Sequence, residues 1–337
     1  MYQIRAIDSK SDWHLGMKSD KSTTAAAPAS ELEQLRKALR RFNPRGSAGR
    51  RILITGGLGL TGSKVLDTYL DALPHAEICL ADLLRDGVEE KWAAHSRVHF
   101  IPVNFLEAGS VSSLLDRVAE GGRLTDAIFI HGGDGRPEWE MPGGKMTISP
   151  EEVWVLNLES VYELLRESLD RGILRGSRDD IATATAISSL SRFPAWFPPP
   201  QVPSDYNVAK DDLYHVMLYL GSRVDREDYV RFHVVSPGTI IDTYPAEIRA
   251  AAERRVEKHL PLRSLANGYD IANAILANTE LGRKVTGVET RVDGGQYWTP
   301  QLHPDPKNDF GESTEVEKGR LVAERLEAKW AARSLPE

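Results

Sequence analysis

The chain has 337 residues, of which 41% are hydrophobic, and it carries a formal net charge of −7 at pH 7. The negative charge argues against general affinity for nucleic acid. No apolar run reaches the roughly 18–20 residues that a membrane span needs, and the N-terminus lacks the apolar core of a signal peptide. The single cysteine, Cys79, excludes an intrachain disulfide, so we expect a soluble cytoplasmic protein.

Residues 1–48 are predicted to form an N-terminal extension. The first 29 residues are polar and are typical of loose chain. Ser30 and Glu33 then form a capping box, which predicts the start of a helix. The apolar positions of that helix are Leu32, Leu35, Leu39 and Phe42. We expect this stripe to pack against the core or against a neighbouring subunit.

A glycine-rich loop follows a short apolar run at residues 51–54, which predicts a buried strand. An amphipathic helix pattern begins at Val65. Strand, glycine loop and helix in this order are typical of a dinucleotide-binding turn, in which the backbone approaches a pyrophosphate at the helix N-terminus. The predicted cofactor contacts in this loop are Gly56, Leu58, Gly59, Leu60 and Gly62.

The next predicted strand, 77–81, ends at Asp82, which lies 20 residues after Gly62. This spacing is the one expected of the acid that binds the adenosine ribose hydroxyls. A carboxylate at this point repels a 2′-phosphate, so we predict NAD rather than NADP, although Arg85 close by weakens that preference. Leu83 is assigned to the same site.

Tyr206 and Lys210 are four residues apart, so in a helix both side chains lie on one face. This places a cation beside a phenol. A nearby cation favours the phenolate and lowers the pKa of a tyrosine from its usual value near 10. The pair therefore indicates a phenol that exchanges protons at neutral pH. Taken alone, a pair with this spacing is more often an ordinary helix surface.

Together these motifs resemble the short-chain dehydrogenase/reductase family over about residues 50–298. Other segments follow the family's order: a strand at 181–187 that precedes two serines, a strand ending in Pro237-Gly238, and a Val-Asp-Gly-Gly segment that ends at Gly295. The resemblance implies an α/β Rossmann fold, with a doubly wound, mostly parallel sheet and helices on both faces. It places the catalytic domain at 49–298.

The resemblance also implies roles for individual residues. Tyr206 is the general acid/base, while Lys210 lowers its pKa and holds the nicotinamide ribose. Ser189, with Ser188 as the alternative, binds the reacting oxygen, and Asn157 holds a water that connects Lys210 to solvent. The other cofactor residues that the resemblance implies are Asn104, Phe105, His131, Gly132, Pro237, Gly238 and Ile240.

One of these positions departs from the family. His131 stands where many members have an asparagine. We interpret it as a polar strand-end residue that bonds to backbone, and a functional replacement is the alternative.

Substrate contacts are expected in two loops. Proline fixes φ, so the proline-rich segment between Ser189 and Tyr206 is predicted to be a stiff loop beside the catalytic residues. A second wall is expected at 243–259, where related enzymes carry a mobile lid. The predicted substrate residues are Phe193, Trp196, Phe197 and Tyr244. They favour a medium-sized apolar or ring-containing molecule.

Residues 299–337 are predicted to form a C-terminal extension. Within it, 313–333 is expected to be a helix that covers either the active site or an oligomer interface. Its candidate contacts are Val316, Leu321, Leu326 and Trp330.

The resemblance predicts an NAD-dependent oxidoreductase that interconverts a ketone and a secondary alcohol on a small or medium organic substrate. Two alternatives stay open. The glycine spacing resembles that of the family's extended branch, which suggests an epimerase or dehydratase with tightly bound NAD. A redox-inactive scaffold is the other. A homo-oligomer, dimer or tetramer, is expected, since the helices around Asn157 and Tyr206 form the family's common dimer interface. No metal, nucleic-acid or membrane partner is predicted.

Overall fold

The computed structural model describes residues 48–84, 92, 95–133, 148–193, 204–223, 227–243, 249–250, 253, 260–280, 284–296 and 312–333. Its strands form one seven-stranded sheet in the order β3-β2-β1-β4-β5-β6-β7, and all neighbours run parallel. The strands are β1 (Arg51–Thr55), β2 (Glu77–Asp82), β3 (Val98–Pro102), β4 (Asp126–Phe129), β5 (Ala182–Ile187), β6 (Val230–Pro237) and β7 (Val288–Val292). This confirms the predicted α/β Rossmann fold.

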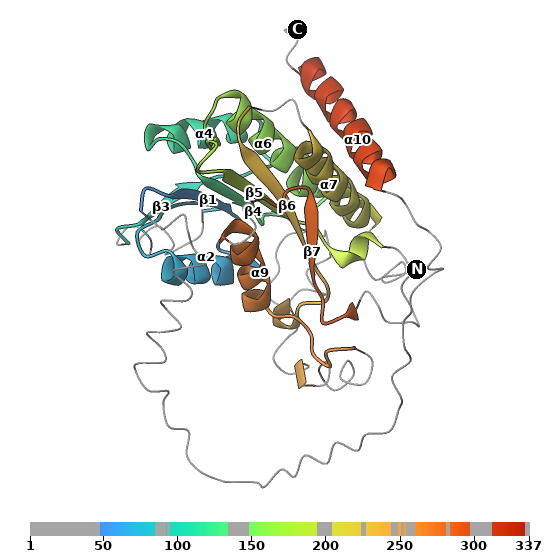
Figure 1. Cartoon of the computed structure of the whole chain (residues 1–337). Helices are drawn as coiled ribbons and strands as arrows, with labels where there is room; N and C mark the ends of the chain where they lie inside the picture. Colours follow the sequence, from blue (N-terminus) through green and yellow to red (C-terminus); the bar gives the residue numbers. More distant parts are fainter. Residues whose placement is uncertain are drawn as a thin grey trace, which may run out of the picture. The chain divides into compact units, whose positions relative to one another are not determined.

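Helices cover both faces of the sheet (Figure 1). On one face lie α2 (Leu60–Ala72) and α9 (Gly268–Glu280), and on the other lie α4 (Ser110–Glu120), α6 (Ser160–Asp170) and α7 (Ser204–Ser222). The remaining helical segments are α5 (Pro150–Trp154), η2 (Val155–Glu159), η3 (Leu190–Arg192), η4 (Ile241–Thr243) and α10 (Glu312–Arg333). Among the helices that the structure describes, none has the length and apolar character needed to cross a membrane.

Each interior strand contributes to two cores because successive side chains point to opposite faces. In β1, Leu53 packs with α4, α6 and α7, whereas Ile52 and Ile54 pack with α2 and α9. Strands buried on both faces read as continuous apolar runs, which is why 51–54 and 77–81 could be recognised as strands. Cys79 lies in β2 and is completely buried.

The strand order fixes where a ligand can bind. From β1 the chain moves outward to β2 and β3, then returns to β4 on the other side of β1. Ligands of open parallel sheets bind at the carboxyl ends of the strands, at such a reversal of strand order. The glycine loop after β1 and His131 after β4 both lie at this point.

The predicted C-terminal helix is present as α10, but its buried positions differ in part from those expected. Leu326 is buried and Trp330 lies against Arg166, whereas Leu321 is 53% exposed, so its prediction as a contact was wrong. The buried positions are instead Gly319, Val322, Ala323 and Leu326, at the i, i+3, i+4, i+7 spacing of one helix face. The side chain of Val316 lies outside the described residues, as does the N-terminal helix expected from Ser30.

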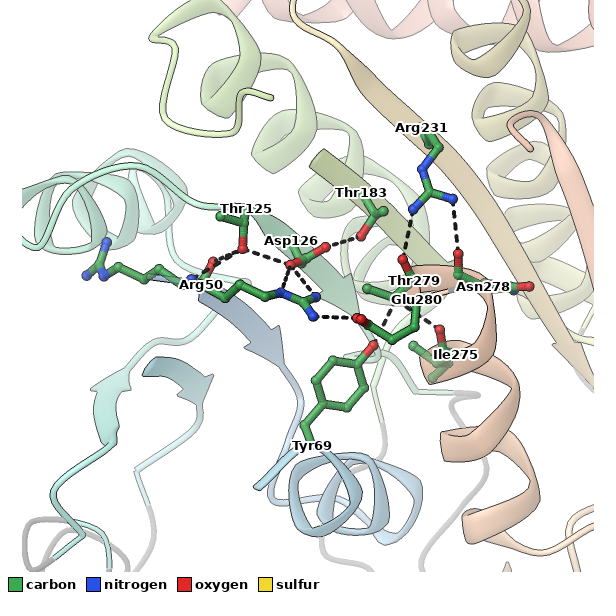
Figure 2. Close-up of polar contacts among 11 residues, drawn as sticks. Arg50, Tyr69, Thr125, Asp126, Thr183, Arg231, Ile275, Asn278, Thr279 and Glu280 are labelled. Atoms are coloured by element: carbon green, nitrogen blue, oxygen red, sulfur yellow. Dashed lines mark hydrogen bonds and ion pairs between the residues drawn. The ribbon is translucent and has the colours of Figure 1, made fainter. Parts of the chain in front are cut away.

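A buried ionic network lies at the amino ends of the central strands (Figure 2). Arg50 binds Asp126 at 2.7 Å and Glu280 at 2.5 Å, and these side chains are 3%, 0% and 8% exposed. Hydroxyl groups of Thr125 and Thr183 also donate to the Asp126 carboxylate, at 2.8 and 2.5 Å. The network joins β1, β4, β5 and α9. Because buried charges are costly unless paired, each member depends on the others.

Replacing Arg50 with Met should lower the free energy of unfolding by about 3–5 kcal/mol, because Asp126 and Glu280 then stay buried without their cation. Urea unfolding measures this change. The matched control is Arg171→Met, which breaks the more exposed ion pair with Asp116 at 2.6 Å and should cost below about 1 kcal/mol. Equal losses in the two variants would show that the network contributes no more than a surface pair.

Candidate cofactor and catalytic site

The glycine loop has the backbone geometry of a phosphate cradle. Gly56 has φ +71°, and a Cβ there would lie 2.5 Å from the backbone nitrogen of His131. A Cβ at Gly62 would lie 2.0 Å from the Gly56 carbonyl oxygen, so this position needs glycine to let α2 approach β1. At Gly59, by contrast, the nearest described atom to a Cβ is 3.4 Å away. The middle glycine therefore leaves room for a ligand to reach the backbone.

The N-terminus of α2 is suited to an anion. Gly59 is its N-cap and offers no side chain to the first N–H groups, and no acidic residue lies in the first turn. The N-terminal N–H groups and the positive end of the helix dipole therefore face the loop without a side-chain partner from the described residues. Leu60, the first residue of the helix, is 59% exposed. A pyrophosphate fits this arrangement.

Asp82 lies at the end of β2 and braces the same loop. Its two carboxylate oxygens accept hydrogen bonds from the backbone N–H groups of Leu58 and Leu83, both at 2.7 Å. The residue is 8% exposed. Each carboxylate oxygen has a second lone pair, so Asp82 can accept further hydrogen bonds from ribose hydroxyls while it holds the loop.

Asn104 and Phe105, two of the predicted cofactor residues, make contacts within the protein. The side-chain oxygen of Asn104 accepts from the N–H of Leu106 at 3.2 Å, and its amide donates to Glu107 at 3.0 Å. Phe105 is 7% exposed, and its ring stacks on that of His131 at a centroid distance of 4.0 Å. The Phe105 side chain is therefore part of the core, and a role for both residues at the cofactor stays a prediction.

His131 connects two elements through its ring. We expected it to bond to backbone, and that expectation was wrong: Nδ1 lies 2.5 Å from the Thr55 hydroxyl and Nε2 lies 2.9 Å from the Ser160 hydroxyl. A neutral ring with its proton on Nε2 satisfies both contacts, accepting from Thr55 and donating to Ser160. Burial lowers the pKa of His131 to about 3, and the nearby charge of Lys210 adds to the effect.

Asn157 lies in η2, a turn of π-helix between α5 and α6. Its side-chain amide donates to the carbonyl oxygens of Gly133 at 2.6 Å and Val153 at 2.8 Å. Its Oδ1 is buried and has no hydrogen-bond partner among the described residues. A Cβ added at Gly132 would lie 2.4 Å from this Oδ1 and 3.5 Å from the Lys210 Nζ. The two polar atoms thus face one point beside the backbone of Gly132.

Tyr206 and Lys210 lie on α7, with Nζ 5.7 Å from the centre of the tyrosine ring. The Lys210 side chain is buried, and its Nζ donates to the carbonyl oxygen of Ile187 at 2.8 Å. Burial lowers the pKa of Lys210 to about 7, because the charged amine loses its hydration. The sequence led us to treat this lysine as a fixed cation. In the folded protein its charge depends instead on what else lies in the site.

The two serines after β5 have different surroundings. The Ser188 side chain is buried and donates to the carbonyl oxygen of Lys210 at 2.8 Å. Ser189 is half-buried, and its oxygen accepts from the backbone N–H and the hydroxyl of Ser191 at 3.1 and 2.8 Å. Ser188 thus uses its proton on α7, whereas Ser189 keeps a proton to donate. This geometry favours Ser189 over Ser188 for contact with a substrate oxygen.

The segment after β6 is held by a residue that the sequence analysis missed. The N–H of Gly238 donates to Val292 at 3.0 Å, and the N–H of Thr239 donates to the side-chain oxygen of Gln296 at 3.0 Å. A Cβ at Gly238 would lie 2.6 Å from that same oxygen. Gln296 follows directly after the Val-Asp-Gly-Gly segment, which was the available signal. The backbone of Pro237 and Ile240 lies on either side of this contact.

Of the predicted substrate residues, the structure describes Phe193, whereas Trp196, Phe197 and Tyr244 lie outside the described residues. Phe193 packs on the guanidinium of Arg192 at 4.0 Å. That guanidinium is buried and bonds Asp211 of α7 and Glu289 of β7 at 3.1 and 3.2 Å. The start of the proposed substrate loop is therefore anchored to the helix that carries Tyr206 and Lys210.

The residues present fit a nicotinamide cofactor. Gly59 leaves space for a pyrophosphate at the α2 N-terminus, and Asp82 retains acceptor capacity for the adenosine ribose. Oδ1 of Asn157 is unpaired among the described residues, and Lys210, whose ammonium form has three N–H groups, lies beside the same point. The arrangement accommodates a hydroxyl-bearing ligand between these elements.

The pH dependence of stability should report the burial of His131. In the folded state its pKa is lowered to about 3, so the unfolded state, with a pKa of about 6.5, binds more protons between these values. The histidine's contribution to stability is complete above pH 6.5 and is lost as the pH falls, by about 1.4 kcal/mol per pH unit. His131→Asn should therefore flatten the decline of the unfolding free energy between about pH 6 and pH 4.

Urea unfolding at several pH values measures this slope. The exposed His75, changed to Asn, is the matched control and should leave the slope as in the unchanged protein. An unaltered slope in His131→Asn would contradict the assignment of a neutral, buried ring.

Comparisons with known proteins agree with this fold. A family model described as enoyl-(acyl carrier protein) reductase matches residues 74–296, which is more than half of the chain. Among solved structures, the chain is similar to a short-chain dehydrogenase/reductase named "SDR:Glucose/ribitol dehydrogenase" from Brucella melitensis. The TM-score is 0.59 and the identity 21%, over 74% of this chain and 97% of that chain, which supports the fold alone. No curated protein matches the chain. The chain belongs to the short-chain dehydrogenase/reductase family.

Proposed function

We propose that the chain is an NAD-dependent oxidoreductase that interconverts a ketone and a secondary alcohol on a small or medium organic substrate. The observation that carries the proposal is the position of Lys210. Its buried Nζ donates to the end of β5 at 2.8 Å, one helical turn from Tyr206. Oδ1 of Asn157, which has no hydrogen-bond partner among the described residues, lies beside the same point. A phenol, an amine and an amide oxygen together suit proton transfer in a site with little water.

Each of the proposed catalytic residues has a separate role in the reaction. When bound, a nicotinamide cofactor supplies or accepts the hydride. Tyr206 gives a proton to the substrate oxygen during reduction and takes it back during oxidation. Ser189, which has a hydroxyl proton to donate, orients that oxygen. A protonated Lys210 stabilises the phenolate form of Tyr206, and Asn157 holds a water that connects Lys210 to solvent.

The buried amine must be protonated to play this part. Its pKa is lowered to about 7 by desolvation alone. Hydroxyl groups that accept hydrogen bonds from Nζ stabilise the ammonium form and raise that pKa again. Binding of a ribose beside Lys210 would therefore supply acceptors for the ammonium and strengthen its effect on Tyr206.

NAD is proposed over NADP because of Asp82. Its carboxylate is buried at the end of β2, and both oxygens already receive backbone N–H groups. A 2′-phosphate at this position would meet a negative charge that is fixed and poorly hydrated. The proposal also includes a cytoplasmic location and a homo-oligomeric state.

Tyr206→Phe tests the proposed acid/base. It should lower kcat by at least about 10²-fold, the usual contribution of a positioned general acid, while the Kd for NAD stays within about twofold. The measurement is turnover of the best substrate from a screen of ketones and secondary alcohols, with NAD binding measured by titration.

The matched control is Tyr229→Phe, because Tyr229 is 47% exposed and lies directly before the amino end of β6. It should leave kcat unchanged. Full activity in Tyr206→Phe would refute the assignment. One NAD copurifying per chain, with turnover that produces no net NADH, would instead favour an epimerase or dehydratase.

Asp82→Asn tests the cofactor preference. Removing the charge should raise the Kd for NAD by about tenfold or more, since a charged hydrogen bond to a ribose hydroxyl is lost, and should tighten NADP binding. Titration with both nucleotides gives the ratio of the two Kd values, and no substrate is needed. Asp67→Asn, on the exposed side of α2, is the control. A ratio unchanged in Asp82→Asn would place the specificity elsewhere.

A further inference from the structure

The short turn that follows β5 is bonded to α7 at both of its ends. At the first end the Ser188 hydroxyl donates to the backbone carbonyl of Lys210 at 2.8 Å. At the second end the guanidinium of Arg192 donates to the carboxylate of Asp211 at 3.1 Å. Lys210 and Asp211 are consecutive residues of α7, so both contacts reach the same turn of that helix. Ser189 lies between the two contacts.

Arg192 is a buried cation with partners on two further elements. Its side chain is 2% exposed, and besides Asp211 of α7 it bonds Glu289 of β7 at 3.2 Å. Its Cζ also lies 3.6 Å from the centre of the Tyr214 ring of α7. A planar guanidinium can bond carboxylates through its rigid fork of N–H groups while it stacks on an aromatic ring. These contacts therefore fix the direction of the side chain as well as its charge.

Ser189 is joined to Arg192 through hydrogen bonds within the turn. The Ser189 Oγ accepts from the backbone N–H and the hydroxyl of Ser191, at 3.1 and 2.8 Å. The Ser189 carbonyl accepts from the backbone N–H of Arg192 at 3.3 Å. The position of Ser189 relative to α7 therefore depends on the contacts at both ends of the turn.

We propose that Arg192 is a positioning residue, which acts through Ser189 rather than on the substrate itself. The pair of Arg192 with Asp211 fixes the second end of the turn. It thereby sets where the Ser189 hydroxyl lies relative to the α7 residues of the proposed site. The role rests on the proposed function, in which Ser189 orients the substrate oxygen while Tyr206 transfers the proton. A displacement of about 1 Å in such a group can lower a rate by about 10²-fold.

Arg192→Met removes the contact and should lower kcat by about 10- to 100-fold, because the Ser189 hydroxyl is displaced. The Kd for NAD should stay within about twofold, since the glycine loop is unchanged. The matched control is Arg50→Met. Arg50 is likewise buried between two carboxylates, but it lies at the amino ends of the strands. This control should lose stability and keep its kcat, which is also the result expected of Arg192 if its role were only structural.

Asp211→Ala removes the same contact from the α7 side and leaves Glu289 beside Arg192. The Asp211 side chain is 35% exposed, so this variant decides the question if Arg192→Met fails to fold. It should lower kcat in the same range, with the Kd for NAD unchanged. Its control is Asp212→Ala, which removes the ion pair of the next residue with Arg325 of α10 and should keep the kcat of the unchanged protein.

Backbone hydrogen exchange gives a second readout that needs no substrate. The N–H groups of Ser191, Arg192 and Phe193 are all bonded within the turn. In the two test variants they should exchange at least about tenfold faster, because the turn opens locally once its second end is released. The two control variants should leave these exchange rates unchanged.

Full kcat in both Arg192→Met and Asp211→Ala overturns the positioning role, as do unchanged exchange rates in the turn. If Tyr206→Phe is inactive in the same assay, that result leaves the proposed function standing. Full activity in Tyr206→Phe overturns the proposed function instead. The exchange rates then still decide whether the pair of Arg192 with Asp211 fixes the turn.

Discussion

The burial of Lys210 is the constraint on which the arrangement of the site depends. Its side chain donates to Ile187 at the end of β5, and its backbone carbonyl accepts from Ser188 just beyond that strand, both at 2.8 Å. These two hydrogen bonds fix α7 against the carboxyl end of the sheet. Tyr206 lies one turn earlier on the same helix, so its backbone is held by the same two contacts. The same burial removes water from the amine and lowers its pKa to about 7, so the geometry is obtained at an electrostatic cost.

The π-turn at η2 fixes the position of Asn157, which faces Lys210 from another element. In an α-helix the N–H of residue 157 would bond the carbonyl of Val153. Here the side-chain amide of Asn157 takes that carbonyl, at 2.8 Å, and reaches Gly133 as well. π-turns of this kind are rare and often occur at functional sites. The exchange fixes the amide so that Oδ1 faces the space beside Gly132 and Lys210.

Local patterns predicted most of the fold, and they are the basis on which the site residues are proposed. The strands and the shared helix face of Tyr206 and Lys210 follow from the periodicity of side-chain directions in strands and helices. The glycine loop follows from the spacing of its glycines. Contacts between distant segments were not predictable in this way. The ring of His131 bonds a hydroxyl 76 residues away, and Gln296 reaches Thr239 across 57 residues. The sequence around His131 does not indicate Thr55 as its partner, and the sequence around Thr239 does not indicate Gln296.

The placement of α10 shows the same limit in another form. Its helical pattern was predictable, but its packing against α6 and α7 was not. The deciding features are small residues: Gly319 and Ala323 permit the close crossing with α7, whereas the larger Leu321 points to solvent. The close approach of the two backbones, rather than the area of one large side chain, determines this contact.

Because α10 belongs to the same chain, it changes what the stability of α7 depends on. A helix with residues buried on all sides needs a partner on its outer face, and a second subunit provides one only above its dissociation concentration. A partner helix in the same chain has an effective concentration set by the connecting segment, which is independent of protein concentration. The support that α10 gives to α7, and through it to Tyr206 and Lys210, is therefore constant under dilution.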